Sequence, residues 1–187
     1  MTATLRNRKS FLVLVAALAM LTFTGCLDGE ETTAEKYREW RTLNEQYVAE
    51  AEAQQDDAGN PFYTKIVPSW APEAFALVHW HNDRALTEAN LTPMDNSTVQ
   101  FTYELFNING ERISDSFSSA DSLYTSKPLQ NIVGVWSPLT HMHVGDSVTI
   151  VIPSQAGYGE VNYGDIKPYS TLIYNIKLKA VTAYEIP

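Results

Sequence analysis

Two His-x-His pairs are the residues whose types and spacing first suggest chemistry: His79 with His81, and His141 with His143. On a β-strand both imidazoles of such a pair lie on one face, as zinc ligands require. No cysteine matches them and the nearby carboxylates are not at ligand spacing, so we expect no metal site. Serine, histidine and aspartate residues are plentiful without a nucleophile-elbow motif. The sequence therefore does not support a hydrolase.

The N-terminal segment has the composition of an export signal. Three basic residues precede an uncharged run over residues 11–23, which is the order of regions in a signal peptide. This run is about a dozen residues long, whereas a helix needs roughly 20 to cross a bilayer, so a permanent transmembrane span is the weaker interpretation. We expect residues 1–25 to be removed.

Cys26, the only cysteine of the chain, directly follows this segment. Residues 21–26 (Leu-Thr-Phe-Thr-Gly-Cys) resemble a bacterial lipobox, in which the cysteine becomes the lipidated N-terminus. The alternative is an ordinary secretory signal with an incidental cysteine. A lone cysteine cannot form an intrachain disulfide. We expect a protein of the bacterial cell envelope, anchored to the outer membrane through lipid on Cys26, on its periplasmic or surface face.

The mature chain is expected to be strongly acidic. Removal of residues 1–25 takes away three of the 13 Lys and Arg residues and none of the 22 Asp and Glu residues, so the net charge becomes 10 minus 22, or −12. Because such a chain offers phosphates no basic face, we expect no nucleic acid partner. About 160 mature residues suffice for one domain with a sizeable core and an appendage.

An amphipathic helix is predicted close to the mature N-terminus. Residues 27–31 form a polar tether, and Thr32 and Glu35 have the spacing of a capping box. Apolar and aromatic residues then recur at helical spacing to about residue 55, at Tyr37, Trp40, Leu43, Tyr47 and Ala51. We expect this stripe to pack on the protein's own domain. A second copy or a second protein is the alternative, which leaves the oligomeric state open.

The pattern after residue 98 is that of β-strands. Apolar and polar residues alternate over 99–105, 148–152 and 172–179. Residues 107–110 (Asn-Ile-Asn-Gly) supply a turn. Each strand has one apolar and one polar face, so the strands predict an antiparallel sheet in an α+β protein.

Six short sequence blocks follow one another between residues 98 and 183. The motif Ile-Pro-x-x-x-x-Tyr-Gly occupies 152–159, and the others lie at 99–103, 109–116, 131–135, 142–145 and 166–174. In this order the blocks resemble the sequence pattern of the FKBP-type peptidyl-prolyl cis/trans isomerases. No block is specific alone, but six in the right order over about 85 residues are.

This resemblance implies a fold and an activity. The fold is a twisted antiparallel sheet of five to six strands wrapped around one short helix. Between helix and sheet lies an apolar pocket for a proline of a polypeptide substrate, and its chemistry requires no cofactor. The implied function is isomerisation of prolyl bonds in exported proteins as they fold. A catalytically weak or inactive binding or chaperone module is the alternative.

The expected organisation has four parts: a signal peptide (1–25), a lipidated tether with the amphipathic helix (26–56), a lead-in segment packed on the domain (57–95) and an FKBP-like isomerase domain (96–187). Carried over by position, the resemblance assigns catalytic roles to Tyr103, Asp115, Ile132, Tyr158, Ile166 and Tyr174. Tyr158 would place its hydroxyl on the substrate carbonyl. The resemblance also assigns the substrate pocket to Ile113, Val135 and Trp136, where the family's tryptophan aligns with Val135 and Trp136 comes one place later.

Overall fold

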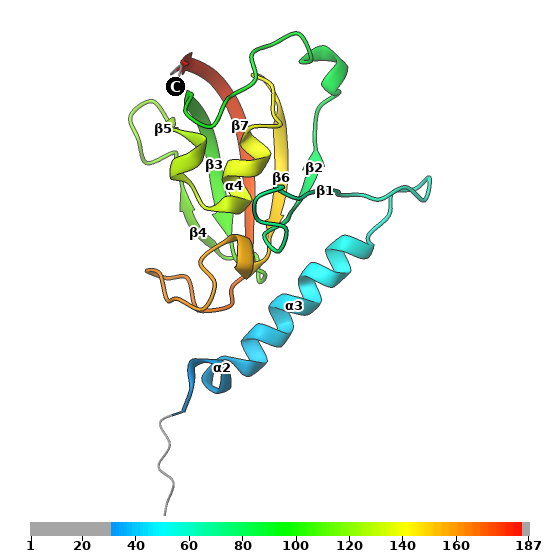
Figure 1. Cartoon of the computed structure of the whole chain (residues 1–187), viewed down its shortest axis with the longest axis vertical. Helices are drawn as coiled ribbons and strands as arrows, with labels where there is room; N and C mark the ends of the chain where they lie inside the picture. Colours follow the sequence, from blue (N-terminus) through cyan, green and yellow to red (C-terminus); the bar gives the residue numbers. More distant parts are fainter. Residues whose placement is uncertain (1–30, 185–187) are drawn as a thin grey trace, which may run out of the picture. The chain divides into compact units, whose positions relative to one another are not determined.

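The computed structural model describes residues 31–184, drawn in colour in Figure 1. Cys26 and the expected signal peptide lie outside the described residues. Within the described part of the chain, no helix is both long and apolar enough to cross a membrane.

One antiparallel sheet of seven strands forms the centre of the domain (Figure 1). Strands β1, β2, β6, β7, β3 and β4 follow one another across it, and β5 also pairs with β3. The strands are β1 (Thr64–Ile66), β2 (Ala76–Trp80), β3 (Thr98–Phe106), β4 (Arg112–Asp115), β5 (Tyr124–Ser126), β6 (Ser147–Ile152) and β7 (Leu172–Ala183). The expected α+β class and twisted sheet are confirmed. The strand number exceeds the five to six expected because the segment before residue 96 contributes β1 and β2.

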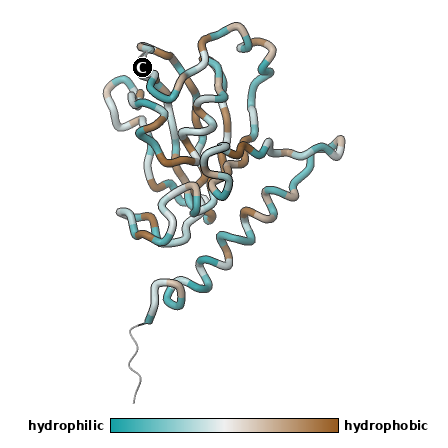
Figure 2. The backbone as a smooth tube through the Cα atoms, viewed as in Figure 1, coloured by the Kyte–Doolittle hydropathy of each residue, from teal (hydrophilic) through white to brown (hydrophobic). Residues whose placement is uncertain are grey.

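The short helix α4 (Val133–Leu139) packs against β2 and β6. Side chains such as Phe101, Leu139 and Ile150 fill the main core between helix and sheet, and Figure 2 shows hydrophobic residues along the strands. Pro138 removes one helical hydrogen bond in the last turn, and α4 ends at the next residue. Three 3-10 turns complete the domain: η1 (Arg84–Leu86), η2 (Pro128–Gln130) and η3 (Ser154–Ala156).

The helix predicted over residues 33–55 is present in two pieces, α2 (Thr33–Lys36) and α3 (Arg38–Ala53), separated at Tyr37. The predicted apolar stripe is partly wrong, because Leu43 is 47% exposed. The buried positions of α3 are Asn44, Val48 and Ala51, of which only Ala51 belongs to the predicted stripe. The prediction failed at this point because it counted only apolar side chains, whereas a polar residue occupies the centre of the buried face.

Asn44 attaches α3 to the protein's own domain. Its side-chain Oδ1 accepts a hydrogen bond of 2.6 Å from the backbone N–H of Thr171, and its Nδ2 donates to the Trp40 carbonyl at 2.7 Å. The Thr171 hydroxyl donates in turn to the Asn44 carbonyl. The Trp40 indole donates to Ser170 at 3.0 Å. These bonds hold α3 next to the segment that enters β7.

The sheet is buried on both faces where β2 and β6 meet. Leu77 on β2 pairs with Val151 on β6, and both pack with Val48 and Ala51 of α3. Val78 and Ile150, which alternate with them, belong to the main core on the opposite face. Because α3 covers one face and α4 the other, this part of the sheet loses the apolar-polar alternation that marks the remaining strands.

Replacing Asn44 by alanine should destabilise the protein by about 1–3 kcal/mol, because the Thr171 N–H would stay buried without its acceptor. The urea midpoint of unfolding measures this change. Gln46→Ala, which removes an exposed amide from the same helix, is the matched control and should leave the midpoint nearly unchanged. Equal midpoints for the two variants would mean that the Asn44 bonds contribute nothing to stability.

Candidate active site

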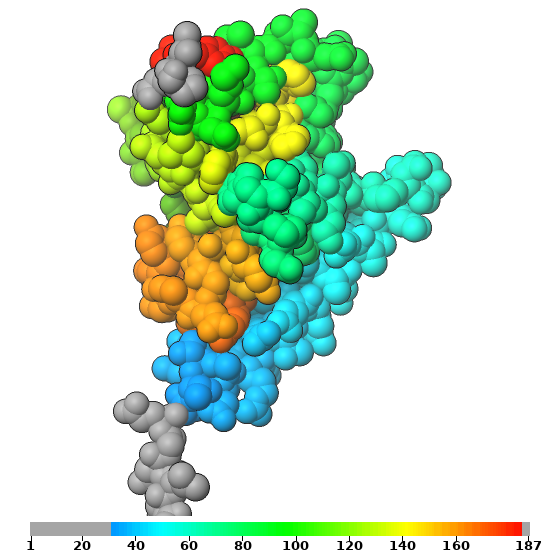
Figure 3. Space-filling model, viewed as in Figure 1, coloured from blue at the N-terminus to red at the C-terminus, as the bar shows by residue number. Residues whose placement is uncertain are grey.

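A cavity of about 490 Å3 lies between the sheet and the start of α4. The loop between η3 and β7 forms a further wall, and in the space-filling view (Figure 3) this orange loop adjoins the yellow-green segment that leads into α4. The cavity is lined by Phe101, Tyr103, Leu105, Ile113, Ser114, Tyr124, Gln130, Asn131, Ile132, Val135, Tyr158, Tyr163, Gly164, Asp165, Ile166 and Tyr174.

Seven of the residues predicted for the site meet at this cavity. They come from three strands, from α4 with its N-cap residue, and from the loop between η3 and β7. They are Tyr103, Ile113, Ile132, Val135, Tyr158, Ile166 and Tyr174. Tyr103 and Tyr174 are the first and the last of these residues in the chain. The register of the sheet brings them together, because they are diagonal neighbours on β3 and β7. Asp115 and Trp136 do not line the cavity.

Asp115 stabilises the chain after β4 instead of facing the cavity. Its carboxylate accepts a hydrogen bond of 2.8 Å from the Phe117 backbone N–H, and it lies 3.5 Å from the Arg112 guanidinium. The neighbouring Ser114 lines the cavity in its place. The hydrogen bond to Phe117 and the ion pair with Arg112 thus hold the carboxylate outside the cavity lining.

Trp136 also points away from the cavity, which corrects its predicted place in the pocket. Its indole ring lies 4.4 Å from that of Trp70, and its Nε1 donates a hydrogen bond to Asp95. Val135, which is 2% exposed, lines the cavity. Successive helical residues are about 100° apart around the helix, so the tryptophan one place later faces elsewhere.

Five tyrosines surround the cavity, of which Tyr124 and Tyr163 were not predicted. The Tyr158 and Tyr163 rings stack with centroids 4.3 Å apart. The Tyr103 ring lies 5.5 Å from Tyr124 and 5.8 Å from Tyr174. Tyr124 lies in a three-residue strand and Tyr163 in an irregular loop, so neither belongs to a periodic pattern that could have indicated it.

Comparisons with known proteins show the family to which this part of the chain is similar. Residues 90–179 match the family described as FKBP-type peptidyl-prolyl cis-trans isomerase. This domain belongs to the FKBP-type family. The curated relatives include FKBP-type peptidyl-prolyl cis-trans isomerase FkpA of Escherichia coli K12 and of Escherichia coli O157:H7, each 29% identical over 87 residues. The matched residues are 46% of this chain and 32% of each relative, so the match spans about a third of the relatives' length.

Solved structures share the fold over more of the chain than the FKBP-type domain alone. A peptidyl-prolyl cis-trans isomerase of Pseudomonas syringae matches with a TM-score of 0.63 and 21% identity, over 79% of this chain and 96% of that chain. FkpA from Escherichia coli matches with a TM-score of 0.62 and 19% identity, over 95% of this chain and 74% of that chain. The fold implied by the six sequence blocks is confirmed.

The hydroxyls of Tyr158 and Tyr174 stay neutral in the FKBP-type cavity at ordinary pH. Burial raises the pKa of Tyr158, and the nearby Tyr163, Tyr124 and Tyr103 raise it further. Burial likewise raises the pKa of Tyr174, with the same kind of contribution from its neighbours. Among the described residues no group forms a hydrogen bond with the Tyr158 hydroxyl, so this donor is available to a ligand.

The raised pKa of Tyr174 predicts a loss of stability at alkaline pH. The hydroxyl ionises near the ordinary pKa of 10.0 in the unfolded chain and above it in the folded domain. The unfolded state therefore binds fewer protons above about pH 10, and the free energy of unfolding falls as the pH rises through this range. Tyr174→Phe should lessen the fall of the urea midpoint between about pH 9 and 11. Identical pH curves for the parent protein and Tyr174→Phe would contradict the argument.

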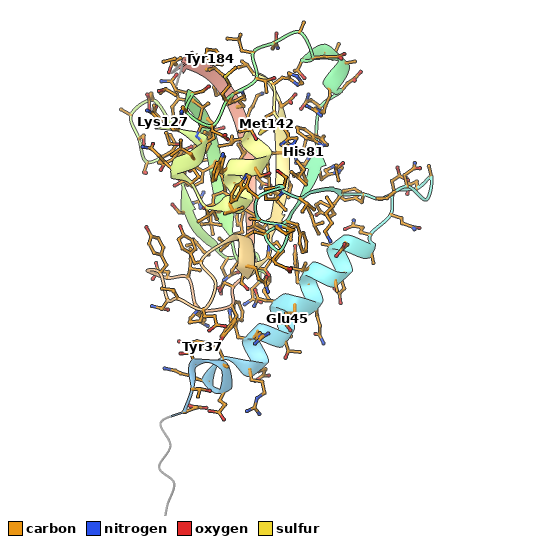
Figure 4. All side chains as sticks on the ribbon, in the orientation of Figure 1. Tyr37, Glu45, His81, Lys127, Met142 and Tyr184 are labelled. Atoms are coloured by element: carbon orange, nitrogen blue, oxygen red, sulfur yellow. The ribbon has the colours of Figure 1, made fainter. Side chains whose placement is uncertain are left out.

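The His-x-His pairs lie apart from the cavity and bind protein groups. The rings of His79 and His81 are 5.0 Å apart at the end of β2, where Figure 4 labels His81. Nδ1 of His79 lies 3.1 Å from the Phe62 carbonyl, and Nε2 of His81 lies 2.8 Å from the Thr149 hydroxyl. Over residues 31–184, no group of three or more His, Cys, Asp or Glu side chains is placed to hold a metal ion.

Proposed function

We propose that the FKBP-type domain catalyses cis/trans isomerisation of the peptide bond before proline in polypeptide substrates. The observation that supports it best is the cavity, because aliphatic and tyrosine side chains from β3, β7, α4 and the loop before β7 converge on it. An uncatalysed X-Pro bond crosses a barrier of about 18–20 kcal/mol and isomerises in tens to hundreds of seconds.

The proposed mechanism requires desolvation and one hydrogen bond. Twisting the bond removes its partial double-bond character and makes the amide oxygen less polar, so an apolar environment stabilises the twisted state more than water does. Ile132, Val135 and Ile166 would exclude water around the proline ring. The Tyr158 hydroxyl would donate to the carbonyl of the substrate and hold the bond in place.

A protease-coupled assay on a prolyl tetrapeptide tests this function. The chain from residue 27 onward should accelerate isomerisation, and Tyr158→Phe should lower kcat/KM by about tenfold or less, which corresponds to one net hydrogen bond. The rate should be the same at about pH 6 and 8, because no side chain transfers a proton in this mechanism. A bell-shaped pH profile would contradict the mechanism, and the absence of turnover would contradict the activity.

A binding module without turnover is the second candidate. It is favoured by two residues that line the cavity. In the family resemblance Val135 aligns with a tryptophan and Ile113 with a phenylalanine, both of which are larger. Aromatic side chains supply more burial area than aliphatic ones. Val135→Trp should therefore raise turnover if the cavity is a weak isomerase site. A folded Val135→Trp variant without activity, together with an inactive parent protein, would favour the binding module.

The proposed place of action is the bacterial cell envelope, where the domain would assist the folding of exported proteins. The lipobox-like residues 21–26 support a lipid anchor on Cys26, and the basic and apolar regions before them support export. Cys26→Ser should yield an uncleaved or soluble protein that no longer fractionates with membranes. Unchanged mass and unchanged fractionation would contradict the lipid anchor.

A further inference from the structure

Asp165 is the only charged residue among those that line the cavity. It lies in a tight turn in which Tyr163 and Ile166 exchange two backbone hydrogen bonds, each of 2.9 Å. Gly164 has a φ of +55° in this turn, a conformation that glycine adopts without strain. The turn therefore holds the exposed carboxylate of Asp165 between two residues that both form walls of the cavity.

The cations near this region are engaged elsewhere. Arg112 lies 3.6 Å from Glu104 and 3.5 Å from Asp115. The Lys167 ammonium lies over the ring of Trp40, 5.0 Å from its centroid. Among the described residues no Lys, Arg or His forms an ion pair with Asp165, and none lines the cavity. The carboxylate is thus available to a cation that a substrate brings.

We propose that Asp165 makes the domain prefer substrates in which Lys or Arg is adjacent to the proline, and disfavour those with Asp or Glu there. This inference rests on the proposed isomerase function. A residue adjacent to the proline lies one Cα spacing away, about 3.8 Å, so its side chain reaches the rim of the cavity. A Lys or Arg side chain can lay its apolar stem on the exposed ring of Tyr163 while its charge approaches Asp165.

The size of the preference follows from the exposure of the carboxylate. Exposed ion pairs are weak, so the ratio of kcat/KM between an Arg-Pro and a Glu-Pro peptide should be about two- to fivefold at low ionic strength. Salt should reduce this ratio, because the screening length falls from about 30 Å at 0.01 M to about 8 Å at 0.15 M. The kcat/KM of a neutral Gln-Pro peptide should lie between the values for the Arg-Pro and the Glu-Pro peptide.

The full chain, Asp165→Asn and Asp57→Asn provide the test, each assayed on peptides of the form Ala-X-Pro-Phe with X as Arg, Gln or Glu. Asp57 is exposed in the turn after α3, so its replacement changes the net charge by the same amount far from the cavity lining. We expect Asp165→Asn to bring the Arg-to-Glu ratio close to one. Asp57→Asn should keep the ratio of the parent protein.

The outcomes separate this inference from the proposed function. Turnover without any preference for Arg over Glu, or an equal loss of preference in both variants, would overturn the role of Asp165 and leave the isomerase function standing. If no peptide is turned over, the isomerase function fails. Calorimetric titration with the same peptides then decides the inference: a Kd ratio that only Asp165→Asn abolishes supports it, and equal Kd values for the Arg and Glu peptides overturn it.

Discussion

Gly134→Ala is expected to destabilise the domain by about 1–3 kcal/mol or more, because α4 has no room for a methyl group at this position. A Cβ at Gly134 would lie 2.2 Å from Cγ2 and 2.9 Å from Cγ1 of Ile152. Ile152 is fully buried on β6 and cannot rotate away without disturbing the core. The helix would have to move off the sheet, which would also displace Ile132 and Val135 from the cavity. Urea and thermal unfolding measure the change.

A double-mutant cycle tests whether this contact is the cause. Ile152→Ala alone should cost about 2–5 kcal/mol through the cavity that it leaves. The double variant Gly134→Ala with Ile152→Ala should cost less than the sum of the two single changes, since the alanine at 134 enters the space left by the isoleucine. If the two single costs in unfolding free energy simply add in the double variant, the contact between position 134 and Ile152 is not the reason why alanine destabilises the domain.

Ile132→Asp is expected to abolish turnover while the domain stays folded. Ile132 lines the cavity and is also the N-cap residue of α4, where its side chain makes no capping hydrogen bond. Aspartate is among the preferred N-cap residues, so the substitution is compatible with the helix. In the cavity, however, it places a charge where the proline ring is proposed to pack, and a charge holds the water that the mechanism must exclude.

The matched control is Ile132→Val, which keeps an apolar side chain and removes one methylene. Such a loss is worth about 0.8 kcal/mol, so kcat/KM should fall by about fourfold or less. Circular dichroism and the urea midpoint establish that both variants are folded. An Asp variant that is folded and as active as the Val variant would mean that the substrate proline does not contact Ile132.

Local sequence patterns determined the three longest strands and the long helix α3. The alternation of apolar and polar residues marked β3, β6 and β7, because a strand with one wet face repeats every two residues. The helical spacing before residue 55 marked α3. The order of six blocks also identified seven of the residues that meet at the cavity. The alternation and the helical spacing depend on a short window of the chain and on backbone geometry, whereas the assignment of the cavity residues depended on the resemblance of the six blocks to the family.

Tertiary structure decided the features that depend on what a side chain meets across the fold. The direction of Trp136, away from the cavity, follows from the rotation of α4, and the burial of Asn44 follows from a partner that is 127 residues away in the chain. The same holds for Tyr163, whose stacking on Tyr158 depends on the path of an irregular loop. A periodic pattern tells which face of an element is apolar. It does not encode which distant group satisfies a polar side chain, so these contacts arise only when the elements are packed together.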